Sequence, residues 1–113
     1  MREGWLLHEG DVVASALEGA GWAGGMRAVH DAVDHELAVV VPLRFFVATW
    51  GAPRPVDVAL LDESSQVKGV FTLRPWRIAR IPRGVVHGVI APFGVFERTK
   101  VMPGDHLEFR PAA

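Results

Sequence analysis

The clearest structural signal in this sequence lies in residues 56–73, which read Val56-Asp57-Val58-Ala59-Leu60-Leu61-Asp62-Glu63-Ser64-Ser65-Gln66-Val67-Lys68-Gly69-Val70-Phe71-Thr72-Leu73. Residues 56–62 form a short apolar run after Pro53 and Pro55, which is typical of a buried strand. Residues 63–65 are polar and supply a turn, and after them apolar and polar positions alternate. The stretch therefore predicts a β-hairpin that joins a buried strand to a half-buried one.

Strand signals of the same apolar, β-branched or alternating kind occur on both sides of this hairpin. They lie in residues 5–7, 12–17, 37–41, 44–50, 85–90 and 106–110. We expect the first two segments to pair across a turn at residues 8–11, where glycine and aspartate favour a chain reversal. Pro42 interrupts the apolar run between residues 37 and 50, so two strand segments with a kink or bulge between them are expected there.

Helical signals are few. Residues 19–29 are expected to form only a brief helix, because Gly19, Gly21, Gly24 and Gly25 each cost up to about 1 kcal/mol of helix stability relative to alanine. Residues 94–99 are the second candidate. Many short strands with few helical residues predict a mainly β chain, a small barrel or sandwich with one or two short helices.

The composition fits one folded domain over residues 1–113, since half of the residues are hydrophobic and 22% are charged. A formal net charge of −1 gives no overall field that would attract nucleic acid or an anionic membrane, so we expect neither partner unless a charged surface is local. The absence of cysteine excludes disulfides, thiolate nucleophiles and thiolate metal sites. Without a signal-peptide core or an apolar span, we expect a soluble, cytoplasmic protein.

Four short motifs together resemble a known family. Residues 49–62, Thr49-Trp50-Gly51-Ala52-Pro53-Arg54-Pro55-Val56-Asp57-Val58-Ala59-Leu60-Leu61-Asp62, are similar to the signature of Domain of Unknown Function 192, in which proline, a hydrophobic residue and aspartate precede a hydrophobic strand. The other motifs occur in the family's order and are Gly25-Met26-Arg27, Leu73-Arg74-Pro75-Trp76-Arg77 and Pro103-Gly104-Asp105. The resemblance implies a β-rich barrel or sandwich and brings no activity.

This chain departs from the family pattern in one place. Trp50, Gly51 and Ala52 stand where many members have lysine, asparagine and threonine. A role of those polar residues therefore does not carry over to this chain. Trp50 itself is expected either to line a ligand pocket on the approach to Asp57 or, as is commoner for a large aromatic side chain, to fill the core.

Asp57 is the first candidate site residue. Strand alternation places it on the face of Ala59 and Leu61, so we expect its carboxylate to be partly buried. Burial without a partner would favour the protonated form and suit a general acid or base, whereas an arginine partner would give the carboxylate a structural role. The structural role is the commoner one, because buried charges are usually paired.

The segment from Arg74 to Arg83 has an arginine at every third residue, which is the period of polyproline II. In that conformation Arg74, Arg77, Arg80 and Arg83 would line one edge and suit phosphate or carboxylate groups, and Trp76 could add stacking. The alternative is an exposed loop whose arginines are solvated or are paired with acids of the same chain.

Metal and hydrolase signals are weak. Residues 30–36 read His-Asp-Ala-Val-Asp-His-Glu, but each helical face would hold only one histidine and one carboxylate, so a solvated loop or cap is expected. His8, His87 and His106 have no ligand-like spacing, and Asp105 follows Pro103-Gly104 as a turn residue. The serines lie outside any nucleophile motif. We therefore expect no metal and no cofactor.

Three functions remain open at this point. The first is a non-enzymatic module that binds a small polar or anionic ligand, or a protein surface, through Trp50, Asp57, Arg74, Trp76 and Arg77. The second is an enzyme in which Asp57 is the general acid or base and Arg77 or Arg27 holds an anionic substrate. The third is an accessory subunit that recruits a protein partner through a sheet edge.

Overall fold

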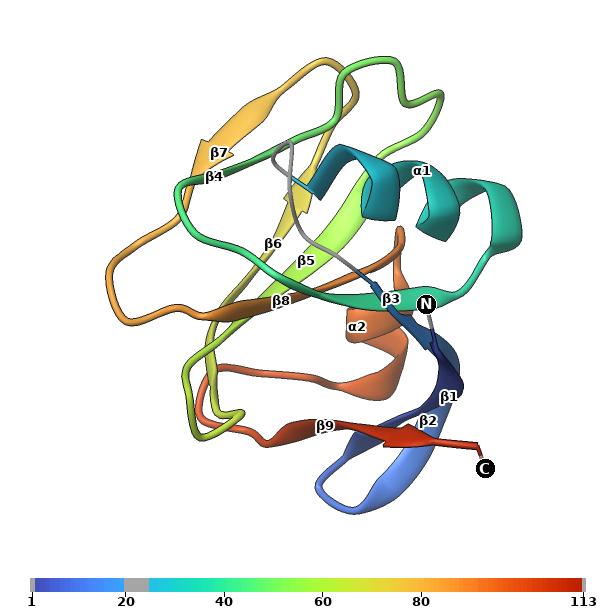
Figure 1. The fold of residues 1–113 in the computed structure, drawn as a ribbon, viewed down its shortest axis with the longest axis vertical. Coiled ribbons are helices and arrows are strands. Elements are labelled where there is room, and N and C mark those ends of the chain that lie inside the picture. Colours follow the sequence, from blue (N-terminus) through green and yellow to red (C-terminus); the bar gives the residue numbers. More distant parts are fainter. Residues whose placement is uncertain (1, 20–24, 113) are drawn as a thin grey trace.

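Seven strands form one strongly curved sheet, and two more form a small second sheet (Figure 1). The computed structural model describes residues 2–19 and 25–112 and orders the large sheet β6-β5-β8-β3-β2-β1-β9. Its strands are β1 (Arg2–His8), β2 (Asp11–Glu18), β3 (Ala38–Pro42), β5 (Val56–Leu61), β6 (Val67–Leu73), β8 (His87–Pro92) and β9 (Leu107–Pro111). The small sheet pairs β4 (Phe46–Ala48) with β7 (Ile78–Arg80). The predicted mainly β fold is confirmed.

Both predicted hairpins are present. The loop between β1 and β2 consists of Glu9 and Gly10, whose φ angles of 52° and 88° match the two-residue turn that suits the twist of antiparallel strands. In the β5–β6 hairpin, Oδ1 of Asp62 accepts hydrogen bonds from the backbone N–H groups of Ser64 and Gln66. These local bonds explain why the sequence identifies the turns so clearly.

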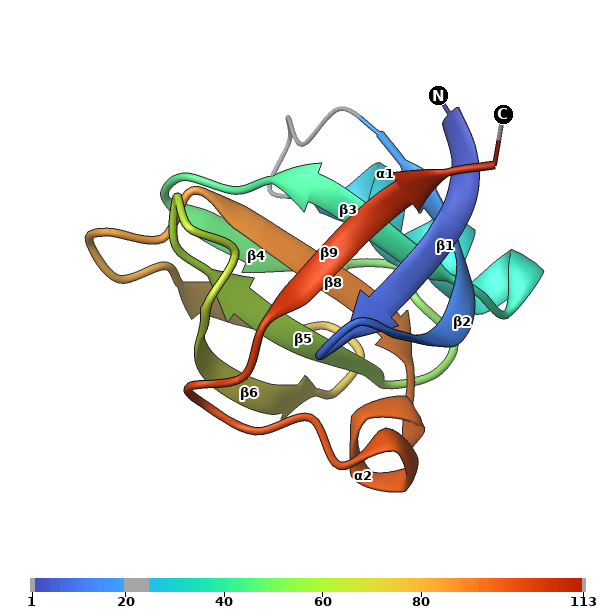
Figure 2. The ribbon, with the colours of Figure 1, turned by 90° about the horizontal axis from the view of Figure 1, so that it is seen from below.

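The large sheet curls until its two edge strands meet at one end. Gln66, just before β6, forms an isolated bridge with His106, just before β9. The Val67 N–H donates to the carbonyl of Asp105, and the Gly104 N–H donates to the carbonyl of Val67, both at 2.8 Å. Figure 2 shows the result, with β1 and β9 crossing in front of β3, β8 and β5. The sheet therefore encloses an interior, although its edges do not pair along their full length in the described part of the chain.

Two hydrophobic cores lie on the two faces of this sheet. The interior core joins residues of opposite walls, such as Leu6, Val89 and Leu107, and is covered by Phe96 of helix α2 (Val95–Thr99). The outer core lies beneath helix α1 (Met26–His35), whose buried residues are Ala28, Val29, Ala32 and Val33. This i, i+1, i+4, i+5 spacing forms one apolar stripe along the helix, which packs on the sheet.

Several expected boundaries are wrong. Residues 30–36 are not a loop, because α1 continues to His35, and residues 26–29 of the predicted helix at 19–29 belong to the same helix. Residues 20–24, which belong to the predicted helix, lie outside the described residues. Only Phe46–Ala48 of residues 44–50 is a strand, and it belongs to the small sheet. Helix α2 confirms the helix expected at residues 94–99, and neither described helix could span a bilayer.

Candidate functional site

Asp57 faces the interior of the curved sheet, as its predicted position beside Ala59 and Leu61 requires. The residue is only 5% exposed. Its Oδ1 accepts a hydrogen bond from the Thr72 hydroxyl, and its Oδ2 accepts one from the Gly94 N–H, both at 2.9 Å. The partners of this carboxylate are thus a hydroxyl group and a backbone N–H group, and not the arginine that the sequence analysis considered. The carboxylate ties β5 to β6 and to the residue that precedes helix α2.

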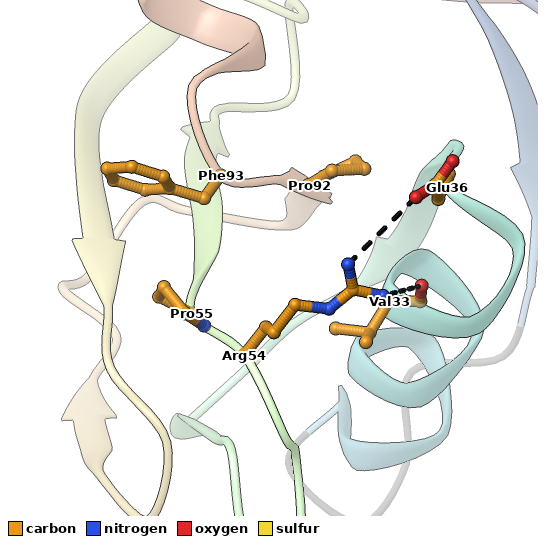
Figure 3. A pocket seen from close by; sticks show the side chains of 6 residues that line it. All are labelled: Val33, Glu36, Arg54, Pro55, Pro92 and Phe93. Carbon is orange, nitrogen blue, oxygen red and sulfur yellow. Dashed lines mark hydrogen bonds and ion pairs between the residues drawn. The ribbon is translucent and has the colours of Figure 1, made fainter.

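A pocket of about 310 Å³ lies between the end of α1 and the chain segments next to β5 and β8. We call it the Arg54 pocket, and its lining residues are Val33, Glu36, Arg54, Pro55, Pro92 and Phe93. Figure 3 shows Arg54 reaching from the chain before β5 towards α1, with Pro55 and Phe93 on the opposite side. The volume lies at the lower end of the range for small-molecule sites.

Arg54 is the main polar group of this pocket. One terminal nitrogen donates to the Val33 carbonyl at 3.4 Å, and the other lies 4.0 Å from a carboxylate oxygen of Glu36 (Figure 3). Both charged side chains are well exposed, so this ion pair is weak. The remaining walls are formed by proline, valine and phenylalanine, so the pocket combines apolar surface with a guanidinium group.

Phe93 links the Arg54 pocket to a second hollow. This hollow has a volume of about 210 Å³ and includes Asp57, Thr72, Gly94 and Glu97 in its lining. The Phe93 side chain is itself 60% exposed. Asp57 fixes the backbone of Gly94, so it also fixes the chain next to Phe93. The sequence analysis did not identify Phe93, Glu36 or Arg54 as pocket residues. The one available signal in the sequence was the position of Arg54 between two prolines, directly before the buried strand.

The predicted residues Arg74, Trp76 and Arg77 lie in a turn held by Thr49. The fully buried Thr49 hydroxyl donates to the Arg74 carbonyl at 2.5 Å and accepts from the Arg77 N–H at 3.0 Å. Backbone bonds join the Thr49 N–H to the Arg77 carbonyl and the Trp76 N–H to the Thr49 carbonyl. The turn is thereby brought next to Trp50, whereas the described hydrogen bonds of Asp57 lead to other residues.

Of the two alternatives for residues 74–83, the polyproline II helix is wrong, because Trp76 has a left-handed φ of 60° and Ile78–Arg80 is strand β7. The exposed arginines agree with the other alternative. The commoner expectation for Trp50 is wrong as well. Trp50 does not fill the core, since it is 47% exposed, and it is absent from the lining of both hollows described above. Thr49, which organises the turn, was not recognised, because its partners follow 25 to 28 residues later in the chain.

A third polar cluster joins the β1–β2 turn to the start of β9. Nε2 of His8 lies 2.7 Å from Oδ2 of Asp105, and Glu9 accepts a hydrogen bond from the His106 N–H. The hydrogen bond from His8, together with one from the Met102 N–H, lowers the pKa of Asp105 from its ordinary value. His8, Glu9 and Asp105 offer possible metal-ligand atoms within 4.8 Å of one another. However, Oδ2 of Asp105 and Oε1 of Glu9 already accept hydrogen bonds that hold the start of β9 in place.

The fold is similar to that of solved structures from two organisms. A protein of unknown function from Novosphingobium aromaticivorans aligns with a TM-score of 0.66 over 82% of this chain and 73% of that chain, at 12% identity. A proposed transcription regulator from Sinorhizobium meliloti aligns with a TM-score of 0.69 over 84% of this chain and 81% of that chain, at 14% identity. At these identities the likeness shows the fold alone.

The family follows from a relative in Pyrococcus abyssi. Over 79 residues the chain is 33% identical to the UPF0127 protein PYRAB11210, and the match covers 66% of this chain and 68% of that protein. The chain belongs to the UPF0127 family. No protein-family model matches it.

Proposed function

We propose that this chain is a non-enzymatic module that binds a small anionic ligand in the Arg54 pocket. The observation that carries the proposal is a pocket of about 310 Å³ in which a guanidinium group faces apolar walls and has only a distant carboxylate partner. Such pockets, largely apolar with a few placed polar groups, are the usual form of small-molecule sites.

The ligand chemistry follows from the free donors of Arg54. A guanidinium group has five N–H donors, and the hydrogen bond to the Val33 carbonyl uses one nitrogen. The others remain for a carboxylate or phosphate group, which the planar guanidinium binds through two parallel hydrogen bonds. Val33, Pro55 and Phe93 would contact the apolar part of the ligand. Glu36 lies far enough from Arg54 to move aside, or to bind a positive group on the same ligand.

Asp57 supports this site indirectly. Its bond to the Gly94 N–H orders the chain beside Phe93, and Pro55 and Asp57 both belong to the motif that resembles Domain of Unknown Function 192. We therefore also propose that the chain is a member of Domain of Unknown Function 192. The enzymatic alternative is less favoured, because both oxygens of Asp57 accept hydrogen bonds within the protein and the residue is almost fully buried.

The test is thermal unfolding followed by tryptophan fluorescence, with a panel of carboxylates and phosphorylated metabolites. A specific ligand at about 100 times its dissociation constant stabilises by roughly 2.7 kcal/mol, a shift of several degrees for a domain of this size. We expect Arg54→Gln to remove the shift. The matched control is Arg110→Gln, which removes the same charge from an exposed residue of β9.

Two results would contradict the proposal. One is a panel without any stabilising compound for the unmodified protein. The other is a ligand whose stabilising effect is the same in Arg54→Gln as in Arg110→Gln. A hit accompanied by turnover that Asp57→Asn abolishes, with the fold intact, would instead favour the enzyme. A sheet edge that binds a protein remains a separate proposal, since β6 and β9 end the large sheet.

A further inference from the structure

Positive charge is concentrated around the small sheet. Residues 43–55 and 74–86, which contain β4 and β7 and their flanking turns, include six arginines and no aspartate or glutamate. All six arginines are exposed. Within residues 2–19 and 25–112, Arg54 has an ion pair, whereas Arg44, Arg74, Arg77, Arg80 and Arg83 have none. The net charge of −1 therefore hides a strongly basic region.

Apolar side chains are exposed in the same region. In the β4–β7 register Phe46 lies opposite Arg80 and Ala48 lies opposite Ile78, while Val47 and Ala79 pack on the outer core. Strand alternation thus directs Ile78 and Arg80 outwards. A hollow of about 650 Å³ lies here and is lined by Phe45, Phe46, Ile78, Arg80 and Ile81. Phe45 is 75% exposed, an unusual exposure for a phenylalanine.

Trp76 adds an aromatic ring that is held in place at the surface. Its φ of 60° is unfavourable for a bulky residue, and the hydrogen bonds of Thr49 keep the turn in this conformation. The side chain is 66% exposed, so no gain in burial explains the strained backbone. The held turn therefore keeps the ring accessible beside Arg74 and Arg77, and a ring fixed in advance loses little conformational entropy on binding.

We propose that this surface binds single-stranded nucleic acid. The arginine–aromatic surface is defined by exposed residues of the two segments, Phe45, Trp50, Arg74, Trp76, Arg77 and Arg80. The segments are joined by the pairing of β4 with β7 and by backbone hydrogen bonds from Thr49 to Arg77 and from Ile81 to Phe45. Guanidinium groups bind phosphates through paired hydrogen bonds, and exposed aromatic rings stack on unpaired bases of any sequence. The site is separate from the Arg54 pocket and does not depend on its occupancy.

The mixture of groups favours a single strand over the other polyanions. The acidic side chains of a peptide would pair with the arginines but have no flat face to stack on Trp50 and Trp76. A duplex keeps its bases stacked inside, where side chains reach only their edges. A single strand presents phosphates and unstacked bases together, which are the two groups that arginine and tryptophan recognise.

Fluorescence anisotropy of a labelled 15-nucleotide oligothymidylate tests the proposal. We expect binding at about 20 mM salt that weakens as salt rises, with a smaller log–log slope in Arg80→Gln by about 0.7 for the one lost phosphate contact. We expect Trp76→Asn to weaken binding by roughly five- to a hundredfold. Asparagine tolerates a left-handed φ, so this variant removes the ring without disfavouring the turn.

Arg110→Gln on β9, far from β4 and β7 in Figure 1, is the control and should bind normally.

Four outcomes would overturn the proposal, provided that thermal unfolding shows the variants to be folded. The first is no binding of the oligonucleotide at low salt. The second is that Arg110→Gln weakens binding as much as Arg80→Gln does, and the third is that a duplex of the same length binds as tightly as the single strand. The fourth is normal binding by Trp76→Asn together with full competition by polyglutamate. The last would identify an acidic protein segment as the partner. Arg54→Gln should bind the oligonucleotide within about twofold of the unmodified protein, because Arg54 lies outside the surface, so this test is independent of the pocket proposal.

Discussion

At the scale of single residues, the carboxylate of Asp57 connects three segments, and this predicts the effect of removing its charge. In Asp57→Asn one oxygen is left to accept from two donors, the Thr72 hydroxyl and the Gly94 N–H. We expect a loss of about 1–3 kcal/mol in the free energy of unfolding, because one donor loses its acceptor. Urea denaturation measures this, with Asp34→Asn at an exposed helix position as the control. Equal stability of the two variants would show that Asp57 is no anchor.

Asp105 makes the stability of the protein depend on pH, and the direction of this dependence follows from the direction of its pKa shift. Its folded pKa lies below the ordinary value of 3.8, chiefly because His8 hydrogen-bonds to it. Near that pH the unfolded chain binds more protons at this position, so stability rises with pH. The contribution is complete above about pH 5 and is lost as the pH falls through the folded pKa.

Asp105→Asn should therefore flatten the stability curve below pH 5. Acid unfolding of the variant and the unmodified protein, followed by tryptophan fluorescence from pH 6 to pH 2, measures the difference. Asp62, whose pKa is also lowered, chiefly by the backbone N–H of Gln66, is retained in both proteins and contributes equally. Parallel curves for the two proteins would contradict the assignment.

Residue-scale chemistry was only partly predictable from the sequence. Alternation along residues 56–61 placed Asp57 on the correct face, because that pattern is local. Its partners Thr72 and Gly94 were missed, since they come from another strand and from a loop after β8. The Thr49 turn and the His8–Asp105 pair were missed for the same reason; His8 and Asp105 are separated by 97 residues.

At the scale of elements, the pairing of β1 with β9 depends on a missing side chain. A Cβ on Gly4 would collide with the backbone carbonyl of Arg110, whereas a Cβ on Gly69 in β6 would meet nothing within 4 Å. We expect Gly4→Ala to cost about 1–3 kcal/mol through overpacking, and Gly69→Ala to be neutral or slightly stabilising. Thermal unfolding of the two variants compares them directly. A Gly4→Ala protein as stable as Gly69→Ala would mean that β9 can shift at little cost.

The two misread elements show which signals compete at this scale. For α1, the glycines at 19–25 and the charges at 30–36 argued against a helix, but the stripe Ala28, Val29, Ala32 and Val33 could be buried and decided the outcome. For residues 74–83, the arginine period suggested an extended helix. The hydrogen bonds of Thr49 and the pairing of β7 with β4 imposed a turn and a strand instead.

At the scale of the whole molecule, the two sheets should differ in local stability. Strands β5 and β8 are central and almost fully buried, whereas β4 and β7 pair only with each other. Backbone amides of β5 and β8 should exchange with solvent at least about tenfold more slowly than those of β7. Hydrogen exchange followed by NMR tests this. Equal protection of β5 and β7 would show that the two sheets unfold as one unit.

The overall composition predicted the fold class, but it did not reveal how charge is distributed over the molecule. Apolar content and alternating strands were sufficient to indicate a small β domain, because they reflect the hydrophobic faces that a sheet must bury. The net charge of −1 argued against a polyanion partner, yet that number averages over the molecule. The separation of an arginine-rich region from the acidic remainder became visible only when the pairing of β4 with β7 brought residues 43–55 and 74–86 together, with all six arginines exposed.

The contact between Gln66 and His106 also constrains the order of events during folding. The β1–β2 hairpin is local and can form as soon as those residues are synthesised. The curved sheet cannot close until β9, at residues 107–111, has reached β1. Before that moment β1 and β6 present unpaired strand edges to solvent. The newly made chain is thus most open to aggregation just before β9 pairs with β1, and loss of β9 would make that state permanent.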